Sequence, residues 1–305
     1  MSTAVWPPIA PEKLIEEEEA SLARELEWLL ASLQETLASL RAGLEECVAL
    51  LAPREPGSTL VLSSLRSDSV KGFVTRVGTR VVRGDVQVKL YGVPPTQGMS
   101  ACKVALSNDP SSHLILGSLV AIRNLLHQCL DIVDVSTWTG DAKDANFISG
   151  QLKLLHDNII EARQSVKGTE GSSSSWLSDS ADANLFSPAL PPNLSFHLCI
   201  SEAALLLELR TLEQAAPPEN TTITGFGLRE RFAVAIGAAR RPDHDEVNEV
   251  FTFRGQQVRV REKLRVESQD PSLMAVMAKL AALEHGVAFA RKALDVVMDT
   301  GSDDL

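Results

Sequence analysis

The chain carries, at residues 22–51, the stretch LARELEWLLASLQETLASLRAGLEECVALL, in which apolar side chains return every seven residues. Two such series interleave and correspond to the d and a positions of a coiled coil. They consist of Leu26, Leu33, Leu40 and Cys47, and of Leu30, Leu37, Leu44 and Leu51. Because residues three and four apart share one face of an α-helix, the stretch predicts a helix that buries one stripe against another helix.

This helix is predicted to cover residues 12–52, because Pro53 cannot continue it. At 1.5 Å per residue its length would be about 60 Å. Its partner can be a second copy of the chain, in a parallel dimer, or a helix elsewhere in the same chain. The leucine pattern alone leaves both alternatives open.

A second seven-residue pattern near the C-terminus bears on that choice. The pair Asp270-Pro271 is typical of a helix start, with a capping residue followed by proline. The helix after it carries apolar residues at alternating spacings of three and four, namely Leu273, Val276, Leu280, Leu283, Val287, Ala290, Leu294 and Val297. Joining two ends of one chain costs a loop-closure entropy that grows only logarithmically with loop length. We therefore predict an intramolecular bundle rather than a homodimeric zipper.

Short antiparallel strands are predicted between these two helices. Stretches rich in valine and threonine and broken by glycine cover residues 59–65, 70–77 and 81–90, and residues 99–106 are a weaker fourth candidate. Together they predict a β-meander.

A β-hairpin is predicted from residues 251–253 and 258–266, which flank Arg254-Gly255-Gln256. Strict alternation predicts that Val258, Val260, Leu264 and Val266 face inward and that Arg259, Arg261, Lys263 and Arg265 face outward. The hairpin would then present a solvated, basic face.

Two amphipathic helices are predicted in the middle of the chain. The first starts at Asp109-Pro110 and extends to Val133, and the second covers residues 144–167. Residues 168–184, rich in serine, predict a flexible loop.

The segment after this loop is predicted to return to regular structure. Residues 194–200 favour a strand, and Ser201 is predicted to cap a helix that ends at Leu212. Residues 222–241 fit no element clearly, apart from a candidate strand at 232–236.

These elements predict an elongated α+β protein, in which the N- and C-terminal helices join one intramolecular helical bundle beside a small antiparallel β-sheet domain. Residues 1–11 are rich in proline and predict a disordered lead-in. The bundle domain is assigned residues 12–52, 109–214 and 270–300, and the β domain residues 58–107 and 222–268.

Charge and hydropathy narrow the class of protein. The net charge of −11 argues against nucleic-acid binding, which needs a surplus of Lys and Arg to neutralise phosphates. Residues 12–52 contain ten acidic and three basic side chains, so the predicted bundle is acidic. No signal peptide and no uninterrupted apolar stretch of about 18 residues is recognised, so we expect a cytoplasmic protein without direct membrane insertion.

No motif in the sequence points to catalysis, to a cofactor or to a metal. Cys47, Cys102, Cys129 and Cys199 lie in no pair with metal-ligand spacing, and we expect reduced thiols. Residues 243–246, Asp-His-Asp-Glu, are more simply explained as a charged surface loop than as a metal site. We therefore expect no enzyme activity and no cofactor, and no catalytic, metal-binding or partner-binding residue is assigned.

Several stretches, taken together and in order, resemble the Rogdi family of leucine zipper proteins, which includes the small subunit of the fungal RAVE complex. The stretches are Glu27-Trp28-Leu29-Leu30, Ser69-Val70-Lys71-Gly72, Asp85-Val86-Gln87-Val88-Lys89-Leu90 and Phe186-Ser-Pro-Ala-Leu-Pro-Pro-Asn-Leu194. With the closing hairpin and heptad helix, the resemblance spans most of residues 25–297.

This resemblance implies a non-catalytic subunit that regulates assembly of the vacuolar H+-ATPase, by helping its peripheral sector to reassociate with its membrane sector. It implies three kinds of partner: a large WD-repeat subunit of the rabconnectin type, a Skp-type adaptor and subunits of the pump. Such a chain would be a monomer outside its complex and would reach vacuolar or endosomal membranes through these partners. The alternative is a homodimeric coiled-coil adaptor unrelated to the pump. A DNA-binding zipper is disfavoured, because the acidic residues 16–19 precede the heptads.

Overall fold

The computed structural model describes residues 10–64, 68–107, 109, 113–139, 144–168, 175–215, 244–247 and 249–298. The chain divides into two compact units. The helical unit comprises Met1–Leu51, Ala121–Ser165 and Ala275–Leu305, and the sheet unit comprises Ala52–Val120 and Val166–Met274. The predicted bundle domain included residues 109–214, of which residues 109–120 and 166–214 lie in the sheet unit instead.

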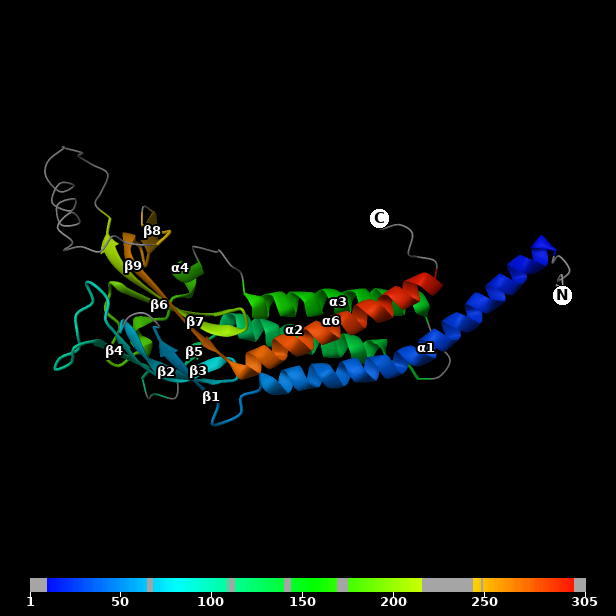
Figure 1. The fold of residues 1–305 in the computed structure, drawn as a ribbon, viewed down its shortest axis with the longest axis horizontal. Coiled ribbons are helices and arrows are strands. Elements are labelled where there is room, and N and C mark those ends of the chain that lie inside the picture. The colour runs from blue at the N-terminus through cyan, green and yellow to red at the C-terminus, as the bar shows by residue number, and fades with distance from the viewer. Residues whose placement is uncertain are drawn as a thin grey trace, which may run out of the picture. The chain divides into compact units, whose positions relative to one another are not determined.

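In its described part, the helical unit is built from four helices, which are shown as coiled ribbons in Figure 1. They are α1 (Pro11–Leu50), α2 (Gly117–Ser136), α3 (Ala145–Lys167) and α6 (Pro271–Val297). Polar contacts join them in pairs. Arg41 of α1 binds Asp134 of α2 at 2.7 Å, and Arg163 of α3 binds Glu284 of α6 at 2.9 Å.

The N- and C-terminal helices pack against each other, as predicted. Helix α1 buries Leu30, Leu33, Leu37, Leu40, Leu44 and Cys47, which are members of the two heptad series. Gly43 lies against Leu283 of α6, and a Cβ at Gly43 would come within 2.7 Å of the Leu283 Cδ2 atom. An exposed ion pair between Glu46 and Lys279 also joins the two antiparallel helices. The chain therefore supplies its own partner for the heptad stripe.

The buried part of the stripe is shorter than the sequence pattern. Leu30 is the first buried residue of α1, whereas Leu26 is only half-buried. Residues 11–20 are exposed throughout, and α1 continues past the other three helices at this end (Figure 1). The heptad pattern predicts a helix correctly along its whole length, but the internal partner covers only its C-terminal half.

The predicted start of the first middle helix is wrong. Helix α2 begins at Gly117, and Ile115, expected on the helix, belongs to the short strand β5 (Leu114–Ile115). This strand pairs with β3 (Arg80–Val88) through Arg80 and Val81. Backbone hydrogen bonds at the sheet edge thus compete successfully with an earlier helix start. The second middle helix begins as predicted, because the Asp144 carboxylate accepts hydrogen bonds from two backbone N–H groups of its first turn.

The sheet unit contains two antiparallel sheets. The first is the predicted meander, with strand order β1-β2-β3-β4. Its strands are β1 (Ser58–Ser63), β2 (Val70–Val77), β3 and β4 (Cys102–Ala105). The second sheet has strand order β6-β7-β9-β8. Its strands are β6 (Leu194–Ser201), β7 (Ala204–Gln214), β9 (Gln256–Gln269) and β8 (Val250–Phe253).

The helix predicted from Ser201 to Leu212 is wrong, because this segment is strand β7. Ser201 pairs with Ala204 across Glu202 and Ala203, both of which have positive φ. Two such residues between paired strands make a tight hairpin turn. Strand β7 lies between β6 and β9 and is buried on both faces, so its leucines show no alternation. A strand with apolar residues on both faces cannot be distinguished from a buried helix by the spacing of its apolar residues.

The predicted hairpin of β8 and β9 is confirmed. The prediction that all four of its apolar residues face the same side is wrong, because β9 contains a β-bulge. The register of β9 against β7 shifts between Thr211 and Leu212, so Val260 pairs with Leu212 while Leu264 pairs with Leu209. Residues directly opposite each other share a face, and neighbours along a strand alternate. Val258 and Val260 therefore face the opposite side of the sheet from Leu264 and Val266, and share their side with Lys263 and Arg265.

The serine-rich segment is also more ordered than predicted. Residues 175–184 form helix α4 (Ser175–Asp179) and the start of the 3-10 turn Ala183–Leu185. Trp176 of α4 is fully buried among Phe251, Phe253 and Val260. This aromatic anchor fixes a segment whose composition is otherwise typical of a loop. Residues 169–174 and the predicted candidate strand at 232–236 lie outside the described residues.

Helix α6 starts where the sequence predicts, and its capping residue, Asp270, also contacts the first sheet. The Asp270 carboxylate accepts a hydrogen bond from the Ser272 backbone N–H. It also binds the Arg76 guanidinium of β2 at 2.6 Å, with both side chains buried. The helix cap is therefore also one half of a buried ion pair.

Helix α6 is the described helix that is long and apolar enough to cross a membrane by length and composition alone. Its most apolar 18-residue window has a mean hydropathy of 1.5, and 33% of that window is buried. The stripe that faces α1, including Leu280, Leu283 and Val287, accounts for part of this hydropathy.

The buried stripe gives a direct test of the internal packing. We expect Leu37→Ala to lower the free energy of unfolding by about 2–5 kcal/mol, because Leu37 is buried and the change leaves a cavity. Leu22→Ala, at an exposed position of the same helix, should change it by no more than about 0.5 kcal/mol. Urea denaturation of both variants measures the difference. Equal effects would contradict the packing described above.

Candidate functional site

Charged side chains gather on one face of the second sheet, within the sheet unit. His197 of β6, Glu208 of β7 and Arg265 of β9 lie side by side in one row of the antiparallel register. Arg210 and Lys263 face each other in the next row. Because the strands alternate, both rows project from the same face, which is the face that also carries Trp176.

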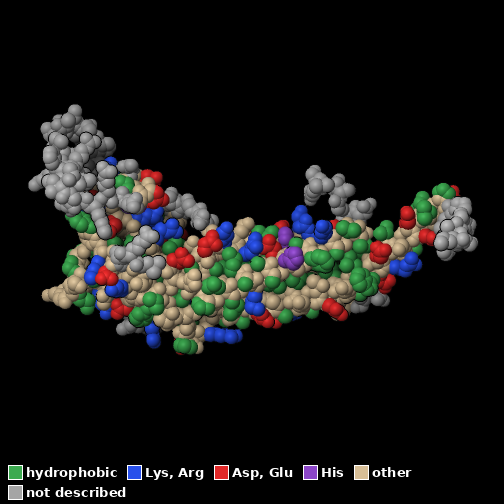
Figure 2. All heavy atoms as spheres, viewed as in Figure 1, with side chains coloured by type: hydrophobic (Ala, Val, Ile, Leu, Met, Phe, Trp, Pro, Cys, Tyr) green, Lys and Arg blue, Asp and Glu red, His purple; other side chains and the backbone are tan. Residues whose placement is uncertain are grey.

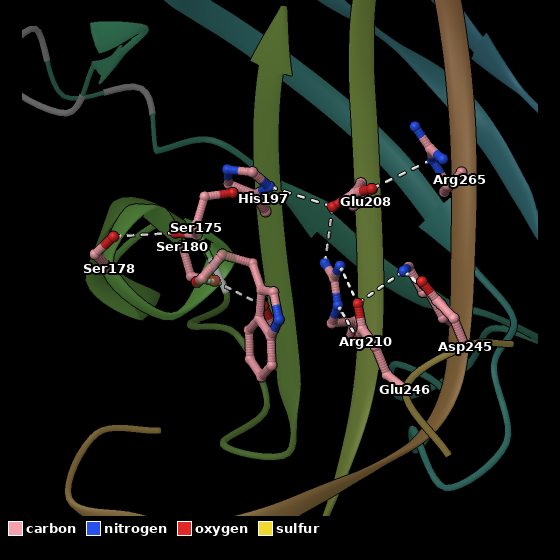
Figure 3. Close-up of polar contacts among 12 residues, drawn as sticks. Ser175, Ser178, Ser180, His197, Glu208, Arg210, Asp245, Glu246 and Arg265 are labelled. Atoms are coloured by element: carbon pink, nitrogen blue, oxygen red, sulfur yellow. Dashed lines mark hydrogen bonds and ion pairs between the residues drawn. The ribbon is translucent and has the colours of Figure 1, made fainter. Parts of the chain in front are cut away.

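Arg210 is the centre of this cluster (Figure 3). Its Nε and Nη2 atoms donate to the two carboxylate oxygens of Glu246 at 2.8 and 2.9 Å. Its Nη1 atom donates to Glu208 at 2.9 Å. The Arg210 and Glu246 side chains are only 2% and 1% exposed, so this bidentate pair is removed from water.

Two more cations complete the cluster. The Lys263 ammonium binds the Glu246 carboxylate at 2.7 Å and that of Asp245 at 2.8 Å. Arg265 binds the second oxygen of Glu208 at 3.2 Å. Three carboxylates are thus matched by three cations, and each charge has an opposite charge beside it.

The pKa values of the carboxylates follow from this arrangement. Burial by itself raises the pKa of Glu208, but His197, Arg210 and Arg265 more than offset it and bring the pKa down to about 2. Burial also raises the pKa of Glu246, and the hydrogen bonds from Arg210 and Lys263 outweigh it, so that this pKa lies below its usual value. Both carboxylates are therefore held in the ionised form.

Trp176 covers the cluster from the side of helix α4. Its ring contacts Phe251 and Phe253 with centroid distances of 5.4 Å, and the Arg210 guanidinium lies 4.9 Å from its centroid. A cation over an aromatic face is attracted by the ring quadrupole, more strongly where water is excluded. The aromatic and ionic contacts together hold α4 and residues 244–247 against the sheet.

This arrangement holds separate segments of the sheet unit in place. His197 is buried, and its Nδ1 atom lies 3.5 Å from Glu208 without a hydrogen bond that the described atoms supply. Among the described residues, no three His, Cys, Asp or Glu side chains come together so that they could hold a metal ion.

The structure places the residues that the sequence singled out. All four cysteines are free, and burial raises the pKa of Cys47 and Cys199 to about 11 and that of Cys129 to about 12. At pH 7 these thiols are protonated and unreactive.

The charged run at residues 243–246 was predicted to be a surface loop, and this prediction is wrong for Glu246, which is buried in the ion cluster. Asp243 lies outside the described residues. The sequence signal that was missed is the pair Glu208 and Arg210 within a leucine-rich run, because buried charges require partners.

Comparisons with known proteins cover nearly the whole chain. The family model described as "Rogdi leucine zipper containing protein" matches residues 25–295. A protein of Schizosaccharomyces pombe named "Regulator of V-ATPase in vacuolar membrane protein 2" is 26% identical over 294 residues, which cover 87% of this chain and 91% of that protein. The match therefore includes both the helical unit and the sheet unit.

The ion cluster predicts a strong effect of one carboxylate and a weak effect of its neighbour. Glu246→Ala leaves the buried Arg210 and the partly exposed Lys263 without their shared anion, and should lower the free energy of unfolding by about 3–5 kcal/mol. Asp245→Ala removes an exposed partner of Lys263 and should cost no more than about 1 kcal/mol. Chemical denaturation compares the two. A similar cost for both would show that Glu246 does not hold the cluster together.

Acid should destabilise the sheet unit through Glu208. The folded pKa of about 2 lies below the ordinary value of 4.5, so the carboxylate stabilises the fold above pH 4.5 and this contribution is lost as the pH falls toward 2. In Glu208→Gln the loss over that range should be smaller, because the amide does not titrate. Glu267→Gln, an exposed position on β9, should keep the wild-type pH dependence. Urea unfolding at pH values from 2 to 6, about the range of the shift, tests this.

Proposed function

The chain belongs to the Rogdi leucine zipper family, and from this membership we propose that it is a non-catalytic regulator of a vacuolar H+-ATPase. The observation that carries the proposal is the similarity to a protein named as a V-ATPase regulator, which extends over 91% of that protein. The alignment also covers 87% of this chain, which supports carrying over a role of the whole protein.

The finer proposal is that the chain is the small subunit of a RAVE-like complex. In this role it helps the peripheral sector of the pump to reassociate with the membrane sector, through contacts with a large WD-repeat subunit, a Skp-type adaptor and the pump itself. The charged side chains of the ion cluster form ion pairs with one another. This supports a role that depends on protein-protein contacts rather than on catalytic side chains.

We also propose that the chain is a monomer outside its complex and is recruited to vacuolar or endosomal membranes by its partners. The buried contact between α1 and α6 supports this, because a zipper dimer would need the same leucines. Burial of one stripe of α6 within the helical unit argues against its insertion into a bilayer. Sedimentation velocity over a range of protein concentrations should give a constant monomer mass. A dimer that resists dilution would support the alternative, a homodimeric coiled-coil adaptor.

Deleting the gene for this chain in its own cells should leave the vacuoles less acidic, because fewer pumps would carry their ATP-hydrolysing sector. A ratiometric pH dye measures the vacuolar lumen, and fractionation measures how much of the peripheral sector is found on membranes. Expression of the intact chain should restore both readings. Normal acidity together with a normal membrane-bound fraction would overturn the proposal.

A further inference from the structure

Helices α1 and α6 leave an open groove beside their contact, within the helical unit. Small residues line it, namely Ser39 and Gly43 of α1 and Ala282 and Gly286 of α6. Glu35, Thr36 and Lys279 also line the groove. The glycines are explained by close packing across the two helices, so the groove alone identifies no ligand.

Exposed apolar residues on α1 continue this groove toward the N-terminus. They lie at intervals of seven, fourteen or twenty-one residues before the groove-lining Glu35 and Thr36, and comprise Leu14, Ile15, Leu22 and Trp28. A straight helix drifts by about 20° per heptad, so all four lie on one side of α1, within a sector about 140° wide. Trp28 is 71% exposed, although a tryptophan on a free surface is unfavourable to hydrate.

Helix α6 continues the groove in the same direction. Phe289 and Val296 follow the groove-lining Ala282 by seven and fourteen residues, and are 73% and 66% exposed. Because α6 runs antiparallel to α1, its stripe extends alongside α1 toward the end where α1 stands alone. Figure 2 shows hydrophobic side chains over the C-terminal half of α6 and again near the N-terminal end of α1. We call the groove with Trp28, Phe289 and Val296 the distal surface.

The charge beside the distal surface indicates what can bind there. Residues 11–29 contain seven acidic and two basic side chains, and Glu35 adds another carboxylate in the groove itself. A second copy of the chain would bring two such acidic segments together, and an anionic membrane would likewise be repelled. A partner rich in Lys and Arg would instead be attracted.

We propose that a basic amphipathic helix of a partner protein docks lengthwise on the distal surface. Its apolar face covers Trp28, Phe289 and Val296 and enters the groove, and its cations lie beside the carboxylates of α1. In this mode of binding, an amphipathic helix lies in a groove between two other helices. It contacts the groove through apolar residues spaced three and four apart. The inference extends the proposed function by naming the surface through which the chain meets a partner.

A synthetic peptide can test the recognition chemistry on the full-length chain. The probe is a fluorescent helical peptide of about 28 residues, long enough to span about 42 Å. It carries leucine at the a and d positions of each heptad and lysine at its charged positions. We expect it to bind, by fluorescence anisotropy, at least about tenfold more tightly than a scrambled peptide of the same composition or a peptide with glutamate in place of lysine. Added salt should weaken the binding.

Variants locate the binding on the distal surface. Trp28→Ser and Phe289→Ser should each weaken peptide binding by at least about tenfold, since exposed aromatic anchors carry a large share of interface energy. Leu154→Ser, at an exposed apolar position of α3, should leave binding unchanged. All three positions are exposed, so thermal melting should confirm that the variants remain folded.

Several results would overturn the inference. Binding of the scrambled peptide as tightly as the patterned one would remove the helix-specific claim. Wild-type affinity in both aromatic variants would move the site elsewhere. Self-association lost in Trp28→Ser would identify a second copy as the occupant, and tighter binding to phosphatidylserine vesicles than to the peptide would identify a membrane. The proton pump is absent from the peptide assay. A negative result in this assay would therefore overturn the docking surface, whereas the regulatory role is tested separately by the acidification experiment.

Discussion

The contact between the two terminal helices is the constraint on which the helical unit depends. The leucines of α1 are buried within the helical unit, where α6 returns from the far end of the sequence and lies antiparallel against α1. The two helices approach closely at Gly43, where a Cβ would require the Leu283 side chain to shift. The name "leucine zipper" accurately describes the spacing of these residues, while the structure uses the spacing to close one chain upon itself.

The sheet unit is held by a different kind of interaction, namely buried ion pairs that join segments distant in sequence. Asp270 both caps α6 and neutralises Arg76 of the first sheet. Arg210 and Glu246 connect the central strand β7 to residues 244–247. Buried charges add little net stability compared with apolar residues, but an unmatched partner is costly, so such pairs select one arrangement of the segments.

These two sets of contacts leave particular surfaces of the chain uncovered. The buried charges of the ion cluster are paired internally, and the buried cysteines of the chain are protonated. What the chain offers a partner is therefore its shape, its exposed apolar residues and its net charge. The uncovered N-terminal half of α1 is the clearest such feature, because its apolar residues keep the heptad spacing after the internal partner has ended.

Local sequence patterns are enough to identify the elements whose residues have one buried and one exposed face. The stripes of α1 and α6, the meander strands and the helix starts at Asp144 and Asp270 follow from local period and capping. Contacts between distant parts of the chain select the helix that covers the stripe of α1 and set the start of this coverage at Leu30. A sequence period indicates that one face of a helix is buried, but it does not identify the partner.

Tertiary contacts also overruled local signals in the second sheet. Strand β7 is buried on both faces and has lost the alternation that would identify it. The bulge in β9 reverses the facing of Val258 and Val260, and Glu246 is buried because Arg210 and Lys263 lie opposite it. Each of these outcomes depends on a residue far away in the sequence, and that is the information a local pattern does not contain.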